Sequence, residues 1–339
     1  MTDLKPFIAK VSEQETLSQT DASAAFDIMM SGDATPTQIG AFLMALRLRG
    51  ETIDEITGAA ATMRLKMNRI TAPDNAMDIV GTGGDAHGTH NISTATAFVV
   101  AGAGVPVAKH GNRAFSSLSG SADVLSSLGV DLEADPKQVE RSVTEAGIGF
   151  LMAPLYHSAM RHVGPSRAEM GIRTVFNILG PMCNPASVNY LLVGTYSAHW
   201  LEPMANALAA LGVKRAWVVH GSDGMDELTT TGPSQVATLV DGSVSMTEVC
   251  PADAGLPTVT LDDLKGGTPE QNADAIRRLL DGEKGPFRDI VLYNAAAALI
   301  VAGKAPALTD GVATAVDAID SGAAKSALER MLALTGSSA

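Results

Sequence analysis

The sequence predicts an α/β protein with a small, all-helical N-terminal domain and a larger α/β domain whose mostly parallel central sheet is covered by helices. Residues 3–71 carry helix caps and helical spacing of apolar residues, whereas short apolar runs alternate with helical segments from residue 77 onward. Such alternation is typical of a parallel sheet. The 339 residues suffice for two domains or one large α/β domain with a sizeable core.

In the N-terminal part, the predicted helices have clear starts and stops. One helix covers 24–30 and stops at Gly32, and the next begins with Thr35 as its cap and Pro36 in its first turn. A third runs from residue 52 to about 68. The charges expected to be solvated on these helices are Arg47, Arg49 and Arg64. We expect a helical domain over 1–72, completed by part of 160–188, and an α/β domain over 73–339.

In the second part, the expected strands are 77–80, 105–108, 148–152, 190–195 and 216–220. The helices expected between them are 93–103, 121–128, 136–146 and 199–211. Residues 232–262 differ in pattern and suggest a small hairpin-like insertion, with strands 235–240 and 243–249 around an Asp-Gly turn. Further helices are expected at 268–281, 287–302 and 309–334.

Composition restricts the possible functions. The net charge of −13, with 24 basic and 37 acidic residues and no basic stripe, argues against nucleic acid as the main ligand. The two cysteines cannot form a disulfide framework and no CxxC pair suggests a metal site. The sequence has neither a secretory signal pattern nor an apolar run long enough to span a bilayer, so we expect a cytoplasmic protein without a membrane partner.

The most informative stretch is residues 78–96, where an apolar run leads into the glycine loop 81–85 and then into Asn91, Ile92, Ser93 and Thr94. The pattern predicts a strand, a glycine loop and a helix N-terminus, a combination that favours an anion such as phosphate. The P-loop and dinucleotide fingerprints do not fit, because no lysine follows the glycines and their spacing is wrong. A glycine-rich turn without a ligand is the alternative, and the neighbouring hydroxyl, amide and carboxylate groups argue against it.

A second polar cluster covers residues 109–117, directly after the predicted strand 105–108, at the edge where open α/β sheets bind ligands. Lys109 offers a positive charge for phosphate, and Asn112 can donate and accept hydrogen bonds. Ser116, Ser117 and Ser121 add hydroxyl groups, and Ser121 is a candidate cap for the helix that follows.

A third cluster, at 220–227, follows another predicted strand. Adjacent carboxylates at Asp226 and Glu227 suit Mg²⁺, which takes one or two carboxylates together with substrate phosphates. Asp223 is expected to shape the turn.

The fourth cluster, at 167–185, contains two arginines that could hold a carboxylate in a two-pronged contact. We expect Asn184 to form a simple turn with the following proline and Cys183 to be a small buried residue. The histidines at 87, 90, 110 and 157 are not spaced as a metal-binding set.

These motifs together resemble the anthranilate phosphoribosyltransferase family over nearly the whole chain. They are DIVGTGGD with NIST, KHGNR with SS and GSAD, GIRTVFNILGP with NP, and VVHGSDGMDE, in the family's order and spacing. The resemblance implies a homodimeric pentosyltransferase whose two substrates meet between a helical and an α/β domain. The run 164–167 around Arg167 departs from the usual family pattern.

The resemblance also implies roles for individual residues. Those similar to the family's phosphoribosyl pyrophosphate site are Gly81, Gly84, Asp85, Thr89, Asn91, Ile92, Ser93, Thr94, Lys109, His110, Gly111, Asn112, Arg113, Ala114, Phe115, Ser116, Ser117 and Ser121. Anthranilate is expected at Gly81, Asn112 and Arg167. The expected Mg²⁺ ligands are Ser93, Asp226 and Glu227.

The implied reaction is attack of the anthranilate amine on C1 of the ribose as pyrophosphate leaves, the second step of tryptophan biosynthesis from chorismate. No covalent or acid–base residue is required, and Lys109 is expected to stabilise the charge that develops on the leaving group. A pyrimidine nucleoside phosphorylase, which uses free phosphate, and a non-catalytic nucleic-acid-binding relative are the two alternatives. The acidic charge and the retained Asp226 and Glu227 argue against the second of these.

Overall fold

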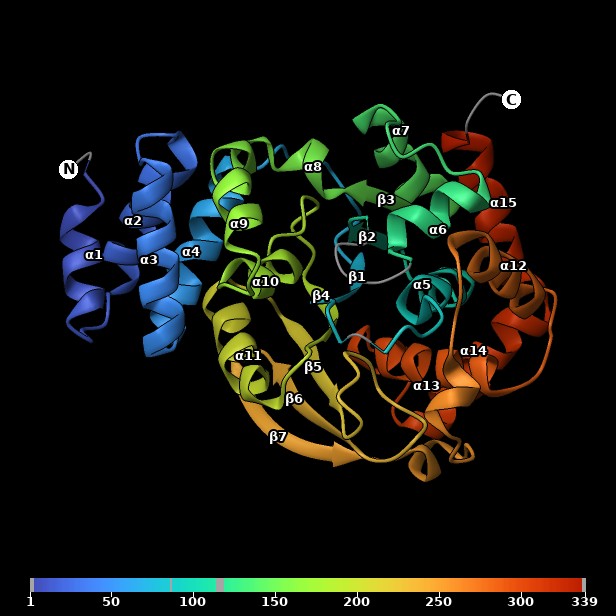
Figure 1. The fold of residues 1–339 in the computed structure, drawn as a ribbon. Coiled ribbons are helices and arrows are strands. Elements are labelled where there is room, and N and C mark those ends of the chain that lie inside the picture. Colours follow the sequence, from blue (N-terminus) through green and yellow to red (C-terminus); the bar gives the residue numbers. More distant parts are fainter. Residues whose placement is uncertain (1–2, 86, 114–118, 337–339) are drawn as a thin grey trace.

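The structure is a computed structural model that describes residues 3–85, 87–113 and 119–336. Four N-terminal helices lie together at one end of the molecule (Figure 1). They are α1 (Lys5–Ser12), α2 (Gln19–Ser31), α3 (Pro36–Arg49) and α4 (Ile53–Lys66). Helices α3 and α4 both begin with a capping box, in which the threonine before the helix and a Gln or Glu three residues later satisfy each other's free N–H groups.

In the described part of the chain, seven strands form one sheet in the order β3-β2-β1-β4-β5-β6-β7. The strands are β1 (Met77–Gly81), β2 (Val107–Gly111), β3 (Ile148–Met152), β4 (Tyr190–Gly194), β5 (Arg215–Gly221), β6 (Ser234–Val240) and β7 (Ser243–Val249). The first five are parallel, and β6 and β7 are antiparallel to their neighbours. The prediction of a small α domain and a mostly parallel sheet is therefore confirmed. The expected hairpin also exists, but it extends the main sheet rather than forming an insertion beside it.

Helices cover both faces of this sheet (Figure 1). The helices of the α/β part are α5 (Ile92–Gly102), α6 (Ser121–Leu128), α7 (Pro136–Arg141), α8 (Ala153–Tyr156), α9 (Gly164–Met170), α10 (Phe176–Leu179), α11 (Leu201–Ala210), α12 (Pro269–Leu280), α13 (Pro286–Val301), α14 (Leu308–Asp320) and α15 (Ala323–Thr335). One core lies between the sheet and α5, α13 and α15. The other continues from the N-terminal helices across α4 and α11 onto the opposite face of the sheet.

Three local predictions were wrong. The single helix expected over 309–334 is two helices, because Gly322 adopts a positive φ of 78° between them. Strand β2 begins and ends later than expected, so Lys109 and His110 lie inside the strand and not in the loop after it. Ser121 is the first residue of α6 rather than its cap, and Gly120 occupies the cap position.

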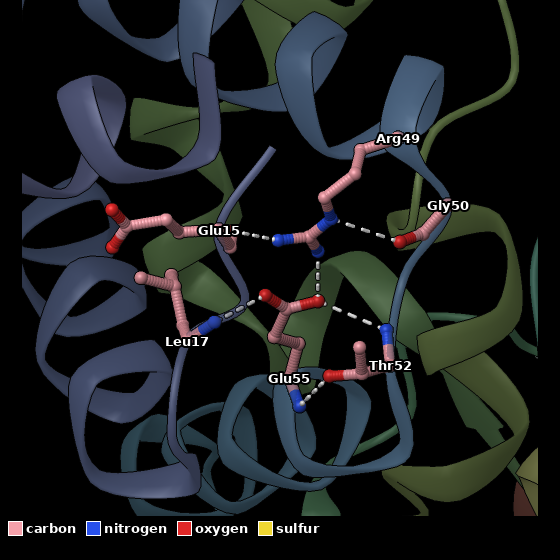
Figure 2. Close-up of polar contacts among 6 residues, drawn as sticks. All are labelled: Glu15, Leu17, Arg49, Gly50, Thr52 and Glu55. Carbon is pink, nitrogen blue, oxygen red and sulfur yellow. Dashed lines mark hydrogen bonds and ion pairs between the residues drawn. The ribbon is translucent and has the colours of Figure 1, made fainter. Parts of the chain in front are cut away.

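Two of the three arginines that were expected to be solvated, Arg49 and Arg64, are folded inward, whereas Arg47 is exposed as expected. Arg49 forms a buried ion pair with Glu55, and their side chains are 6% and 1% exposed (Figure 2). Glu55 also accepts hydrogen bonds from the backbone N–H groups of Leu17 (2.8 Å) and Thr52 (2.9 Å). Arg64 is half-buried and donates to the carbonyl groups of Met182 (2.7 Å) and Leu211 (3.1 Å). Both guanidinium groups donate to backbone carbonyl groups from other segments of the chain. Such carbonyl groups need donors once tertiary packing removes them from water.

Segments far from the N-terminus pack against the helical part. Helix α9 packs on α3, the short 3₁₀ helix Ser158–His162 packs on α2, and α10 contacts α4. The expected boundary between the two domains at residues 72 and 73 stays a prediction. One hydrophobic core contains residues from both sides of that boundary. No helix of the described residues has the length and apolar character needed to cross a membrane.

Candidate active site

The candidate site lies where the central parallel strands end. Strands β1 and β4 pair in register, with Gly81 opposite Gly194, and the connections from these two strands lead to opposite sides of the sheet. Open α/β sheets bind ligands at such a switch point. A side-chain carbon on Gly194 would overlap the backbone carbonyl of Asp226, and one on Gly81 would press on the Asp226 carboxylate. The loop after β5 can therefore reach the ends of β1 and β4 only because both strands end in glycine.

Asp226 is the acidic centre of this edge. It is 8% exposed, and its Oδ2 accepts a hydrogen bond from the Gly83 backbone N–H at 2.7 Å. Burial, together with the nearby charge of Asp85, raises the pKa of Asp226 to about 7. Burial and the charge of Asp226 likewise raise the pKa of the half-buried Glu227. The carboxylates are therefore crowded, and a bound cation would relieve their repulsion.

Lys109 supplies positive charge from beneath the loop. It is 3% exposed, and its Nζ donates to the Ile79 carbonyl at 2.6 Å and to the Ser93 hydroxyl at 3.3 Å. Burial lowers its pKa, whereas the charges of Asp78, Glu227 and Asp226 oppose that shift. The ammonium group thus contacts the first turn of α5 rather than the open loop that the sequence predicted.

The N-terminus of α5 meets the same cluster. The Ser93 backbone lowers the pKa of the Glu227 carboxylate, which opposes the larger effect of burial. The hydroxyl of Thr94 is buried and has no hydrogen-bond partner among the described residues. A helix N-terminus with an unused hydroxyl beside it suits an anion.

These groups fit Mg²⁺ together with a phosphate-bearing ligand. Among the residues that the structure describes, no group of three or more His, Cys, Asp or Glu side chains is placed to hold a metal ion by itself. Mg²⁺ does not need such a cage, because it takes one or two carboxylates and completes its shell with water and substrate phosphates. Asp226 and Glu227 provide that number of carboxylates beside the anion-binding end of α5.

The loop that follows β1 is held from two sides. Arg173, between α9 and α10, donates to the Gly84 carbonyl, and its guanidinium lies 4.1 Å from the centre of the Tyr196 ring. The Arg173 carbonyl in turn accepts a hydrogen bond from Arg47 of α3. This chain of contacts links the helical domain to the glycine loop. The sequence marked Arg173 as one of two arginines that could hold a carboxylate, but it did not indicate this contact with the glycine loop.

The loop that follows β2 is described only in part. Ala114, Phe115, Ser116 and Ser117 lie outside the described residues, so their predicted roles stay predictions. Asn112 and Arg113 are exposed, and Arg113 pairs with Asp123 at 3.1 Å. The Ser121 hydroxyl donates to the Asn112 carbonyl at 3.3 Å, which closes the loop onto the start of α6.

A buried polar layer lies under β1 and β2. Asp78 is fully buried, and it accepts hydrogen bonds from the His110 backbone N–H (3.1 Å) and from the Asn184 side chain (2.7 Å). Asn184 also donates to the Ala108 carbonyl at 2.7 Å, so it bridges two strands rather than only forming the predicted turn. Nε2 of His110 and Nε2 of His157 are 3.2 Å apart, and burial lowers their pKa values to about 3 and about 4.

Two expectations about individual residues are confirmed, and one residue lies apart from the cluster. Asp223 shapes its turn by accepting hydrogen bonds from the Met225 N–H and from two threonine hydroxyls, and Cys183 is fully buried. Arg167 lies on α9 with its guanidinium 5.0 Å from the centre of the Phe176 ring. Because α9 packs on α3, Arg167 lies on the side of the site that faces the helical domain.

Fold and site together define a class of protein: a helical bundle joined to an α/β domain whose strand ends carry a phosphate-type loop and a pair of carboxylates. The family model described as "Glycosyl transferase family, a/b domain" matches residues 73–325, and "Glycosyl transferase family, helical bundle domain" matches residues 5–67.

Individual relatives narrow this class. An anthranilate phosphoribosyltransferase of Parvibaculum lavamentivorans is 62% identical over 335 residues, covering 99% of this chain and 98% of the relative. One of Rhodospirillum rubrum is 60% identical, with 99% and 97% coverage. The solved enzyme of Thermus thermophilus has a TM-score of 0.92 at 46% identity, covering 97% and 99% of the two chains. The solved anthranilate phosphoribosyltransferase of Saccharomyces cerevisiae in complex with PRPP and Mg has a TM-score of 0.89 at 29% identity. The match covers 98% of this chain and 97% of the yeast chain. The chain belongs to the anthranilate phosphoribosyltransferase family.

Proposed function

We propose that this chain is an anthranilate phosphoribosyltransferase. It transfers the 5-phosphoribosyl group of phosphoribosyl pyrophosphate to the amine of anthranilate, giving N-(5-phosphoribosyl)anthranilate and pyrophosphate. The observation that carries the proposal is the meeting of Asp226, Glu227 and Lys109 at the N-terminus of α5, directly under the glycine loop. This arrangement supplies positive charge, a helix N-terminus and metal-type carboxylates to one edge of the sheet.

Asp226, Glu227 and the Ser93 hydroxyl are the groups that would hold Mg²⁺. When bound, the ion would neutralise charge on the pyrophosphate. The backbone of the loop 81–85 and the first turn of α5 would bind the phosphate oxygens. Lys109, held under the loop by the Ile79 carbonyl, keeps a positive charge close to the leaving group as negative charge grows there.

The acceptor side depends on position rather than on acid–base chemistry. The aromatic amine of anthranilate is already neutral near pH 7 and needs no strong base before it attacks C1. We propose that Arg167 and Asn112 hold the acceptor, Arg167 through a contact to its carboxylate. The partly buried setting of Arg167 against Phe176 supports this role, because it keeps the guanidinium in one orientation.

A homodimer and a cytoplasmic location are further proposals. Helix α3 carries two exposed apolar side chains one turn apart, Met44 (38% exposed) and Leu48 (72% exposed). Large exposed apolar groups on one helix face favour association with another surface. Light scattering on a size-exclusion column tests the dimer, and a monomeric mass at micromolar concentration would contradict it.

The test of the function is direct. Anthranilate is fluorescent, and its signal should disappear when phosphoribosyl pyrophosphate and Mg²⁺ are added together with the protein. Omission of either compound should preserve the signal. Cleavage of thymidine by free phosphate would instead support a nucleoside phosphorylase, and no fluorescence loss with folded protein would contradict the transferase.

A further inference from the structure

Asn91 occupies the cap position of α5 but does not cap the helix. Asparagine is favoured at this position because its side-chain oxygen accepts a hydrogen bond from the N–H groups of the first turn. Here the Asn91 side chain makes no such bond. Its Oδ1 instead accepts from Nδ2 of Asn272 at 2.8 Å and from the Ser119 hydroxyl at 3.1 Å. Its Nδ2 donates to the Ser119 carbonyl at 3.2 Å.

Asn272 is fixed in orientation. It lies in the first turn of α12 and is 1% exposed. Its Oδ1 accepts the Gly267 backbone N–H at 2.8 Å, so its Nδ2 must point the other way, toward Asn91. A flipped amide would place an NH₂ group against an N–H donor, which costs a buried hydrogen bond.

The backbone before α12 is attached to the same loop. The Gly266 N–H donates to the Gly88 carbonyl at 2.9 Å, and the His90 N–H donates to the Leu264 carbonyl at 3.1 Å. A side-chain carbon on Gly266 would lie 2.7 Å from the Thr89 carbonyl, so the two segments are in close contact. These backbone contacts hold the segment before α12 against the loop that contains Asn91. They therefore set the distance between Asn272 and Asn91.

We propose that Asn272 is a positioning residue of the transferase. It holds the Asn91 side chain away from the N-terminus of α5 and joins it to the Ser119 loop, which leaves the Thr94 N–H of the first turn available to the phosphate-bearing substrate. This inference rests on the proposed function, because it assumes that phosphoribosyl pyrophosphate binds at that helix end. Without Asn272, the Asn91 side chain is free to rotate and cap α5 itself, in competition with the substrate.

Asn272→Asp is the sharpest test, since it keeps the acceptor for Gly267 and replaces the donor to Asn91 with a charged acceptor oxygen, which Asn91 Oδ1 cannot bind. The KM for phosphoribosyl pyrophosphate should rise about tenfold, the size expected for one buried hydrogen bond and for a competing cap. The KM for anthranilate should change less than about twofold, because the contact lies on the phosphate side. In an Asn91→Ala background, Asn272→Asp should cause no further rise, since no side chain is left to misplace.

Gln271→Ala is the matched control. Gln271 is the neighbouring residue of the same helix turn, and its side chain accepts the Thr268 N–H of its own cap. This variant should lower the melting temperature without changing the KM for phosphoribosyl pyrophosphate. If Asn272→Asp does not fold, Asn272→Ser replaces it, because the shorter side chain carries no charge and cannot reach Asn91.

The outcomes separate the two proposals. No turnover by folded wild-type protein would contradict the transferase function itself. Normal wild-type turnover with an unchanged KM in the Asn272 variant would overturn the positioning role. Equal changes in every kinetic constant, or full additivity with Asn91→Ala, would also overturn it, because a purely structural defect gives that result.

Discussion

Replacing Glu55 with glutamine should destabilise the protein far more than its conservative chemistry suggests. Glu55 pairs with Arg49 and accepts hydrogen bonds from the N–H groups of Leu17 and Thr52 (Figure 2). The glutamine amide would place an NH₂ group against at least one of these donors. It would also remove the charged partner of the Arg49 guanidinium, whose side chain is 6% exposed.

The expected magnitude follows from this geometry. Removing one partner of a buried ion pair costs about 3–5 kcal/mol, because the remaining charge stays buried. Arg49 also donates to the carbonyl groups of Glu15 and Gly50, and these bonds moderate the loss. We therefore expect a decrease of about 3 kcal/mol in the free energy of unfolding, at the lower end of that range.

Urea denaturation followed by circular dichroism measures this decrease. Asp21→Asn is the matched control, because Asp21 forms an exposed ion pair with Lys10 at 2.9 Å in the same helical bundle. An exposed pair contributes about 0–1 kcal/mol, so the control should change little. A loss below about 1 kcal/mol for Glu55→Gln would refute the reasoning that burial, and not the mere presence of the pair, sets the cost.

Three further predictions concern the site. Asp226→Asn combined with Glu227→Gln should abolish Mg²⁺-dependent turnover while the protein stays folded, and unchanged turnover across a Mg²⁺ titration would remove both carboxylates from the mechanism. Gly194→Ala should cost about 1–3 kcal/mol of stability and reduce activity, because the new methyl group overlaps the Asp226 backbone; crystallography of the variant would show the displaced loop. Burial keeps His110 and His157 neutral, so their contribution to stability is full above pH 6.5 and falls as the pH drops toward about 4. His157→Gln should therefore show a shallower loss of unfolding free energy between pH 6.5 and 4.5 than the wild type, and parallel curves would contradict this assignment.

The structure assigns roles to residues that carry no motif of their own. Asn272 follows an ordinary helix cap, and its signal in the sequence is only the preceding Gly266 and Gly267. Arg173 lies inside a recognised motif, yet its contact with the glycine loop joins residues 89 positions apart. Neither contact could be predicted from local spacing, because each depends on how α12 and the segment before α10 dock against the loop.

The sequence by itself determined the fold class, the strand–loop–helix character of residues 78–96 and the candidate ligands at Asp226 and Glu227. These features follow from local rules: periodicity sets element type, glycine sets where the chain turns, and adjacent carboxylates keep their chemistry wherever they lie. Only the tertiary structure decided which charges are buried. Lys109 lies within a strand and under the loop, and Arg49 is folded inward to Glu55. Burial and pairing depend on contacts between distant segments, so the same side chain can be a solvated charge or part of a buried network.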